Sequence, residues 1–323
     1  MNNLKKIGMT ALAASLVSTS VFAGELTVSG SASMTYENYS TTDTSVAAGN
    51  NKTFTQGNNI FFNGGGELDN GMTVALSFEL DEGSTNSQLW DNHSVTISSD
   101  AMGSFSLAGH GGSSAASALD TTAAGDIWDN FDATAGIGAE VFNASKAGDN
   151  IMKYTLPAMV DGLSAAVSYQ AGGNASAGAG SSTAYGLTYT GVEGLTVSYG
   201  YGEDNDTSAD EREVTTMAAA YAYGPVTVAY TESENDATTA STDQKLKSVA
   251  VSYTISENLS VKYGQETFEN QADAVDPEYS SFSAAYTSGG MTVSVGTQSA
   301  ENADGTATDK DADYNYLTLG FAF

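Results

Sequence analysis

Cysteine is absent from this chain of 323 residues, and proline occurs only three times. A chain without cysteine has no disulfide bonds, so its fold has to be stabilised by other means. Basic residues are also scarce, because ten Lys and Arg stand against 39 Asp and Glu. Such an excess of negative charge repels nucleic acid and attracts cations. We therefore expect no nucleic-acid partner.

Long apolar runs are missing as well. Beyond the N-terminal segment the longest uninterrupted run is 217–223, whereas a membrane helix needs about 20 apolar residues. The chain is nevertheless 41% hydrophobic, with 17 Tyr and 12 Phe, which is too apolar and aromatic for a disordered acidic protein. It is therefore either soluble or crosses a membrane as strands.

The N-terminal residues have the pattern of a secretory signal peptide. Lys5 and Lys6 precede the apolar run 7–17, and Val21-Phe22-Ala23 offers a small-residue cleavage site. We expect residues 1–23 to be removed and residues 24–323 to form a single domain. Loss of the two lysines would change the formal net charge from −29 to −31.

From Gly24 onward, apolar and polar residues alternate in short segments that end in turns. In the first segment the apolar positions are Leu26, Val28, Gly30, Ala32, Met34 and Tyr36. A period of two is that of a β-strand, whose successive side chains point to opposite faces. The whole chain contains sixteen such segments. The sequence therefore predicts an all-β fold.

The connections between these segments alternate between short turns and longer polar loops. Asp69–Gly71 and Gly224-Pro225 are short, whereas Glu203–Glu213 is long. Turns thus lie at one end of the strands and loops at the other, which is typical of an outer-membrane barrel with an even number of strands. Strands can span hydrocarbon only as a closed barrel, because every backbone group must be paired within the protein. We predict a transmembrane antiparallel 16-stranded β-barrel.

The apolar set is then expected to face lipid, and the small polar side chains to face the interior. Sixteen strands enclose more volume than those side chains can fill, so the interior should hold water. Tyrosines at the ends of the apolar segments, such as Tyr36 and Tyr154, are expected to form aromatic girdles.

The alternation stops between Gly111 and Asp149. A loop of this length is uncommon in a compact domain and is usually functional or disordered, and its aromatic residues argue against disorder. We predict a long, inward-folded third loop. Its acidic residues are Asp120, Asp126, Asp129, Asp132 and Glu140, and its aromatic residues include Trp128 and Phe131.

Taken as a whole, the chain resembles the general-diffusion porins of the Gram-negative outer membrane. The resemblance rests on the signal peptide, sixteen strands, seven turns, eight loops, a long third loop and a last strand, 315–323, that ends in Phe323. It implies a channel for passive diffusion of small hydrophilic solutes and ions. It also implies a homotrimer in contact with the lipid bilayer and lipopolysaccharide, and it makes Phe323 the signal read by the outer-membrane assembly machinery.

The resemblance further implies that the third loop narrows the pore and that Asp120, Asp126, Asp129, Asp132 and Glu140 form the acidic side of this constriction. Family members usually face this loop with a cluster of basic residues on the wall. Here only Lys153 and Lys262 are expected there, on the inward phase of their strands. We therefore expect a stronger preference for cations than a balanced pore would have. Lys245 and Lys247 fall on the outward phase, where contact with anionic headgroups or lipopolysaccharide is expected.

Two other functions stay open. In a substrate-specific channel, Trp128, Phe131, Tyr314 and Tyr316 would form an aromatic track for a sugar or another nutrient. In a structural or adhesive barrel, the lumen would be closed. An enzyme is not expected, because His93 lies on the outward phase and a Ser-His-Asp set would depend on His110 alone.

No cofactor is expected apart from calcium. Its preferred ligands are oxygen atoms, which one loop supplies through Asp204, Asp206 and Asp210 and another through Asp304, Asp309, Asp311 and Asp313. Neither run has the spacing of an EF-hand. A loop site for Ca²⁺ is therefore an expectation from composition.

Overall fold

The computed structural model describes residues 26–41, 50–81, 90–132, 141–172, 180–205, 211–238, 243–306 and 310–323. Several predicted features lie outside these ranges, namely the signal peptide 1–23, Glu140, Asp206, Asp210 and Asp309.

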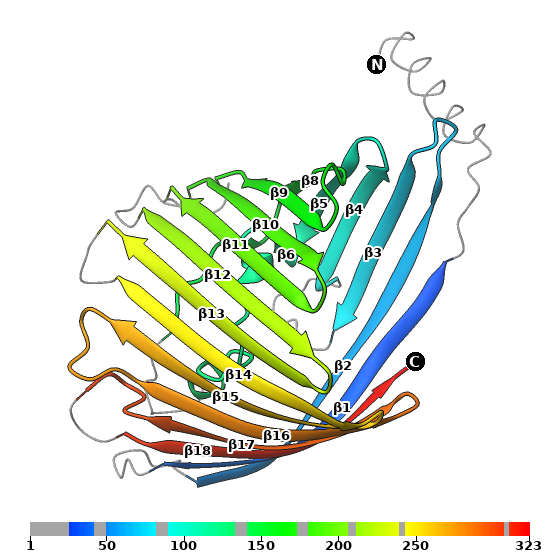
Figure 1. Cartoon of the computed structure of the whole chain (residues 1–323). Helices are drawn as coiled ribbons and strands as arrows, with labels where there is room; N and C mark the ends of the chain where they lie inside the picture. Colours follow the sequence, from blue (N-terminus) through cyan, green and yellow to red (C-terminus); the bar gives the residue numbers. More distant parts are fainter. Residues whose placement is uncertain are drawn as a thin grey trace, which may run out of the picture.

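Sixteen antiparallel strands form one closed barrel, as predicted (Figure 1). The first is β1 (Thr27–Thr41) and the last is β18 (Ala312–Ala322), and they pair with each other to close the ring. The strands between them are β2 (Asn50–Glu67), β3 (Thr73–Asp81), β4 (Asn92–Ser99), β5 (Gly103–His110), β8 (Ile151–Thr155), β9 (Leu163–Gln170), β10 (Ser182–Val192), β11 (Leu195–Asp204), β12 (Arg212–Tyr223), β13 (Val226–Ala237), β14 (Gln244–Ser256), β15 (Leu259–Asn270), β16 (Glu278–Ser288) and β17 (Met291–Glu301).

The alternating pattern places apolar side chains on the outer face of the barrel. In β14, for example, Val249 and Val251 are 41% and 43% exposed, whereas Leu246 and Ser248 point inward and are 2% exposed. Transfer of exposed apolar surface from water to hydrocarbon is favourable by about 25 cal/mol per Å². The outer face is therefore suited to lipid.

Short turns join the strands at one end of the barrel, as the sequence predicts. Gly71 and Gly194 occupy two of these turns with φ angles of 79° and 75°. These angles lie in the left-handed region, which glycine adopts without steric cost. The end of the barrel with these turns is called the turn end below, and the opposite end is called the loop end.

The last residue completes the seam between β1 and β18. The backbone N–H groups of Gly30 and Phe323 each donate to the carbonyl oxygen of the other, at 3.0 Å. The ring of Phe323 lies so close to Gly30 that a Cβ atom there would be 2.8 Å from a ring carbon. Glycine at position 30 therefore makes room for the terminal aromatic ring.

Helix is confined to the third loop within the described residues. It consists of the 3₁₀ turn η1 (Ser117–Leu119) and the single-turn helix α2 (Asp129–Asp132). No helix in the described part of the chain is long and apolar enough to cross a membrane.

Candidate functional site

The third loop leaves the barrel wall after β5 and returns to it at β8. Its two ends form a short antiparallel ladder in which β6 (Gly112–Ser113) pairs with β7 (Ala147–Gly148). This ladder holds the two ends of the loop together.

Between these ends the loop is hydrogen-bonded to side chains on the inner face of the barrel. The N–H of Ala115 donates to Ser168 Oγ of β9 at 2.9 Å, and the N–H of Ala124 donates to Ser248 Oγ of β14 at 2.8 Å. Both serines are buried and lie on the phase opposite to the exposed apolar residues. The loop therefore runs along the inside of the barrel.

A buried carboxylate on β15 anchors the centre of the loop. Glu266 is 1% exposed and accepts hydrogen bonds from the Thr122 hydroxyl and, at 3.1 Å, from the N–H of Trp128. From the same strand, the Lys262 ammonium donates to the carbonyl oxygen of Ala124 at 2.8 Å. Hydrogen bonds to charged groups contribute about 1.5–3 kcal/mol each. Lys262 points inward as predicted, and its ammonium is bound to the loop.

Apolar packing joins the loop to the same wall. Phe131 and Ile127 of the loop are 0% and 1% exposed, and they belong to one cluster with inward-facing wall residues. The wall members of this cluster include Val214, Leu246, Phe268, Tyr279 and Tyr314. The sequence predicts small polar side chains on most of the inner face, with Tyr314 among the exceptions. The structure adds Val214, Leu246, Phe268 and Tyr279 at the loop ends of these strands, because the loop needs apolar surface to dock on.

The burial of Phe131 also changes the aromatic track predicted for a substrate-specific channel. With 0% exposure Phe131 cannot touch a solute, and Tyr314 is only 7% exposed. Trp128 and Tyr316 pack against the cluster but are partly exposed. The prediction of a continuous aromatic track through all four residues is therefore wrong.

The acidic residues of the loop differ in their surroundings. Asp129 in α2 is exposed, whereas Asp126 is half-buried and accepts a hydrogen bond from the Thr122 N–H at 3.0 Å. The backbone of Asp132 lies in α2, but its side chain is not among the described ones.

Asp120 is the acidic residue with the most unusual environment. The N–H of Ser145 donates to its Oδ2 at 3.2 Å, while its Oδ1 is buried without a hydrogen-bond partner among the described residues. Burial raises the pKa of Asp120 to about 7 because it disfavours the charged form. At neutral pH this carboxyl is therefore only partly ionised, in contrast to the fixed negative charge that the sequence suggests.

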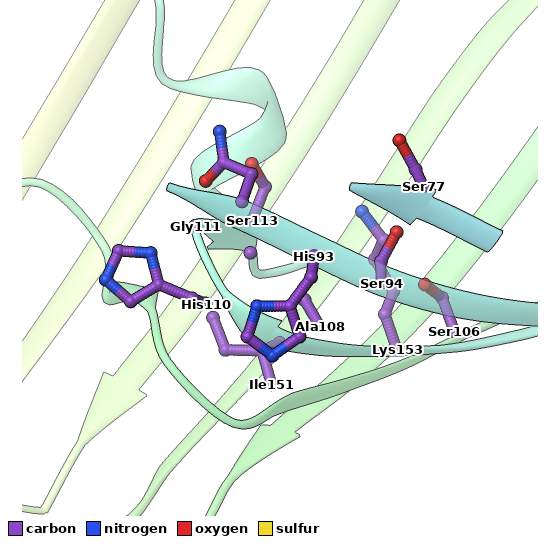
Figure 2. A pocket seen from close by; sticks show the side chains of 12 residues that line it. Ser77, His93, Ser94, Ser106, Ala108, His110, Gly111, Ser113, Ile151 and Lys153 are labelled. Carbon is purple, nitrogen blue, oxygen red and sulfur yellow. The ribbon is translucent and has the colours of Figure 1, made fainter. Parts of the chain in front are cut away.

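A cavity of about 200 Å³ lies at the wall formed by β3, β4, β5 and β8, and Figure 2 shows the side chains that line it. Lys153 lies there beside Ser94 and Ser106, on the inward phase of β8 as predicted. Within the described residues Lys153 forms no ion pair, so its ammonium is available to the water in the cavity.

Two glutamates on the inner wall were not singled out from the sequence. Glu37 of β1 accepts a hydrogen bond from the Thr55 hydroxyl at 3.0 Å. Glu79 of β3 accepts from the side-chain amides of Asn59, at 3.0 Å, and Asn92. The inward orientation of both glutamates could have been found from the sequence, because each follows an outward aromatic residue in its strand and successive side chains point to opposite faces.

The lysines expected on the outer face are found there, in ion pairs. Lys245 lies 2.8 Å from Glu232, and Lys247 lies 2.5 Å from Glu269, on neighbouring strands. Their contact with lipid headgroups or lipopolysaccharide stays a prediction.

Both histidines line the same cavity as Lys153 (Figure 2). His93 stands opposite His110 where the register between β4 and β5 shifts, and its ring lies against Gly109. The prediction that His93 faces outward is therefore not confirmed. The Nδ1 of His110 is hydrogen-bonded to the Asp91 carbonyl, and its Nε2 lies 3.5 Å from Asp149 at the end of the loop. No serine hydroxyl among the described residues is hydrogen-bonded to His110.

Within the described ranges, no three His, Cys, Asp or Glu side chains are grouped in a way that could hold a metal ion. Asp304 forms an ion pair with Lys310 at 2.7 Å. Asp204 is described but Asp206 and Asp210 are not, so the calcium site at these residues stays a prediction.

Comparison with known proteins agrees with this geometry. A family model described as Gram-negative porin matches residues 8–287. A search of curated proteins gave no match. The similar solved structures include an anion-selective porin from Comamonas acidovorans, which is 14% identical with a TM-score of 0.69, over 93% of this chain and 100% of the other.

Two further structures show the same likeness. OmpF from Salmonella typhi, in complex with daunomycin, is 16% identical with a TM-score of 0.69 and covers 93% of this chain and 98% of its own. OmpT from Vibrio cholerae is 15% identical with a TM-score of 0.64 and covers 94% of this chain and 100% of its own. These identities indicate the fold alone, whereas the family model covers most of the chain. The closed barrel and the matched family together show that this chain belongs to the Gram-negative porins, the channel-forming barrels of the outer membrane.

Proposed function

We propose that this porin forms a water-filled channel through which small hydrophilic solutes and ions diffuse passively, with a preference for cations. The observation that carries the proposal is the balance of charge on the inner face. Glu37, Glu79 and Asp126 carry carboxylates there, while the Lys262 ammonium is bound to the loop. Lys153 faces the cavity in the wall formed by β3, β4, β5 and β8.

A low-dielectric wall concentrates the field of fixed charges in a narrow water path. Even with the dielectric constant of bulk water, one charge at 4 Å contributes about 1 kcal/mol, which is roughly a fivefold enrichment of a monovalent cation. The Comamonas acidovorans porin has the same fold and is anion-selective. The sign of the selectivity therefore depends on the side chains that line the pore.

The proposal extends to assembly. We expect a homotrimer, because small outward residues such as Gly64 and Gly66 of β2 would allow flat surfaces to meet. Phe323 would serve as the signal for outer-membrane assembly, in addition to its contact with Gly30. Calcium bound by the acidic loops would offset repulsion among their carboxylates.

Reversal potentials in planar bilayers test the selectivity. In a KCl gradient the wild-type protein should give a permeability ratio that favours K⁺ over Cl⁻. The triple variant D126N/D129N/D132N should move this ratio towards unity, because three carboxylates near the constriction are lost. Neutralising Lys153 as K153Q should raise the ratio.

A matched control removes the same number of charges at the turn end. In D161N/E193Q/E257Q the three replaced residues are exposed and lie in short turns, so the ratio should stay close to the wild-type value. An anion-selective wild-type channel, or equal effects of the two triple variants, would contradict the proposal. A folded protein without any conductance would favour a structural or adhesive barrel.

A further inference from the structure

Three tyrosines, Tyr39, Tyr314 and Tyr316, form a patch on the inner face of the barrel where β1 meets β18. Tyr39 stands directly opposite Tyr314 in the strand register. Their ring centres are 4.4 Å apart, and those of Tyr314 and Tyr316 are 5.5 Å apart, with 27° between the ring planes in both pairs. The three rings are therefore stacked in a row, which is called the tyrosine patch below.

A glycine on the neighbouring strand makes room for one end of this row. The phenol end of Tyr316 lies over Gly296 of β17, where a Cβ atom would be 2.5 Å from the Cζ atom of the ring. The ring therefore covers the wall and does not project across the lumen. Tyr39 and Tyr316 are both partly exposed, while Tyr314 behind them is 7% exposed.

A carboxylate borders the tyrosine patch. Glu37 stands opposite Tyr316 in the register, and its Oε1 accepts hydrogen bonds from the Tyr314 hydroxyl at 3.3 Å and the Thr55 hydroxyl at 3.0 Å. Within the described residues Glu37 forms no ion pair. A carboxylate therefore lies beside exposed aromatic surface, and no cation of the described residues is paired with it.

We infer that the tyrosine patch and Glu37 form a subsite for organic cations, that is, solutes in which an ammonium group is attached to apolar carbon. The ring faces attract a cation through their quadrupole, the carboxylate attracts it by charge, and the apolar carbon atoms cover aromatic surface. An anion would be repelled, and a neutral sugar could hydrogen-bond to Glu37 but would lack the attraction between opposite charges. This inference rests on the proposed channel and adds a class of solute to it.

Current block by benzyltrimethylammonium tests the subsite. With wild-type channels in planar bilayers, this cation should reduce the K⁺ current in a saturable manner, whereas equal concentrations of maltose should not. E37Q should weaken the apparent affinity at least fivefold. Y316L should weaken it about threefold or more, which lies within the range of cation–π contributions, and Y316F should restore it.

The matched control is E79Q. Glu79 is also an inward glutamate, but it is 8% exposed and its oxygens accept from the amides of Asn59 and Asn92. The ring opposite it in the register is that of Phe61, and no stacked tyrosines border it there. E79Q removes the same charge from the wall and should change the affinity for benzyltrimethylammonium less than twofold. Equal losses in E37Q and E79Q would overturn the inference, because they would show general electrostatic attraction only.

The remaining outcomes separate the subsite from the channel. K⁺ conductance without block by the organic cation would overturn the subsite and leave the channel intact, and block by maltose at similar concentration would show a carbohydrate site instead. If the folded protein does not conduct, the proposed channel fails. In that case quenching of intrinsic fluorescence by benzyltrimethylammonium in detergent micelles, compared between wild type and E37Q, decides the subsite.

Discussion

At the scale of single residues, burial changes what a charged side chain can do. Asp120 and Glu266 are both carboxylic acids inside the barrel. Glu266 receives hydrogen bonds from Thr122 and Trp128 on its two oxygens and so fixes the loop. Asp120 has one buried oxygen without a partner among the described residues, and its pKa is raised to about 7. One buried carboxyl group therefore anchors the loop through two hydrogen-bonded oxygens, whereas the other keeps one oxygen without a partner among the described residues.

This difference predicts a pH dependence of selectivity. Since the pKa of Asp120 is about 7, its negative charge should appear as the pH rises from 6 to 8, and the permeability ratio of K⁺ to Cl⁻ should rise with it. The variant D120N should lack this component. Both histidines are unchanged in the variant, so the difference between the two pH profiles belongs to Asp120. Identical profiles would contradict the prediction.

The raised pKa also fixes the sign of the effect on stability. Because the folded loop favours the protonated form of Asp120, ionisation opposes folding over the interval between the ordinary pKa of 3.8 and the raised value of about 7. The contribution of Asp120 to stability is therefore greatest below this interval, falls across it as the pH rises, and is constant above it.

At the scale of elements, the third loop and the wall fit each other through small residues. Gly264 of β15 faces the loop, and a Cβ atom there would be 2.6 Å from the Cβ of Ala124. Gly320 of β18 is also on the inward phase, but its nearest atom would be 3.9 Å away. The two glycines therefore offer a matched pair of sites.

We expect G264V to displace the loop and G320V to leave it in place. Inserting a larger side chain into a packed contact typically costs 1–3 kcal/mol, enough to detach part of the segment around Ala124. Limited proteolysis of the folded proteins in detergent should then cut G264V within residues 111–149 faster than G320V. Equal rates for the two variants would show that the loop does not rest on Gly264.

Much of this element structure could be predicted from the sequence, because the alternation of side chains is set by the backbone. The phase of Lys153, Lys262, Lys245 and Lys247 follows from their neighbours and agrees with the structure. The residues that these inward side chains contact could not be predicted in this way. Nothing near Lys262 in the sequence indicates a bond to Ala124, and the inward apolar residues Val214 and Leu246 have a purpose only once the loop is placed against them.

At the scale of the whole molecule, the charge of the chain acts together with the closed shape of the barrel. Fixed charges in the lumen should select cations strongly only while salt does not screen them. The Debye length falls from about 10 Å at 0.1 M ionic strength to about 3 Å at 1 M. We therefore expect the permeability ratio of K⁺ to Cl⁻ to fall as the KCl concentration rises from 0.1 to 1 M. In this series the ratio of the KCl concentrations on the two sides of the bilayer is kept constant.

The triple variant D126N/D129N/D132N serves as the control for this measurement. It should show a weaker dependence on salt than the wild type, because fewer charges remain to be screened. A wild-type ratio that is the same at both concentrations would show that the selectivity arises from size or from direct binding.

The seam between β1 and β18 has a consequence for how the polypeptide could be rearranged. The start of β1 and the final residue are neighbours through the paired bonds of Gly30 and Phe323. A short peptide linking them, with new chain ends opened at Gly224-Pro225, would keep the neighbours of every strand. Such a circular permutant would bury the former terminus inside a continuous chain. Comparison of this permutant with the wild type would therefore separate two roles of Phe323 in assembly, namely the packing of its side chain and its position at a free C-terminus.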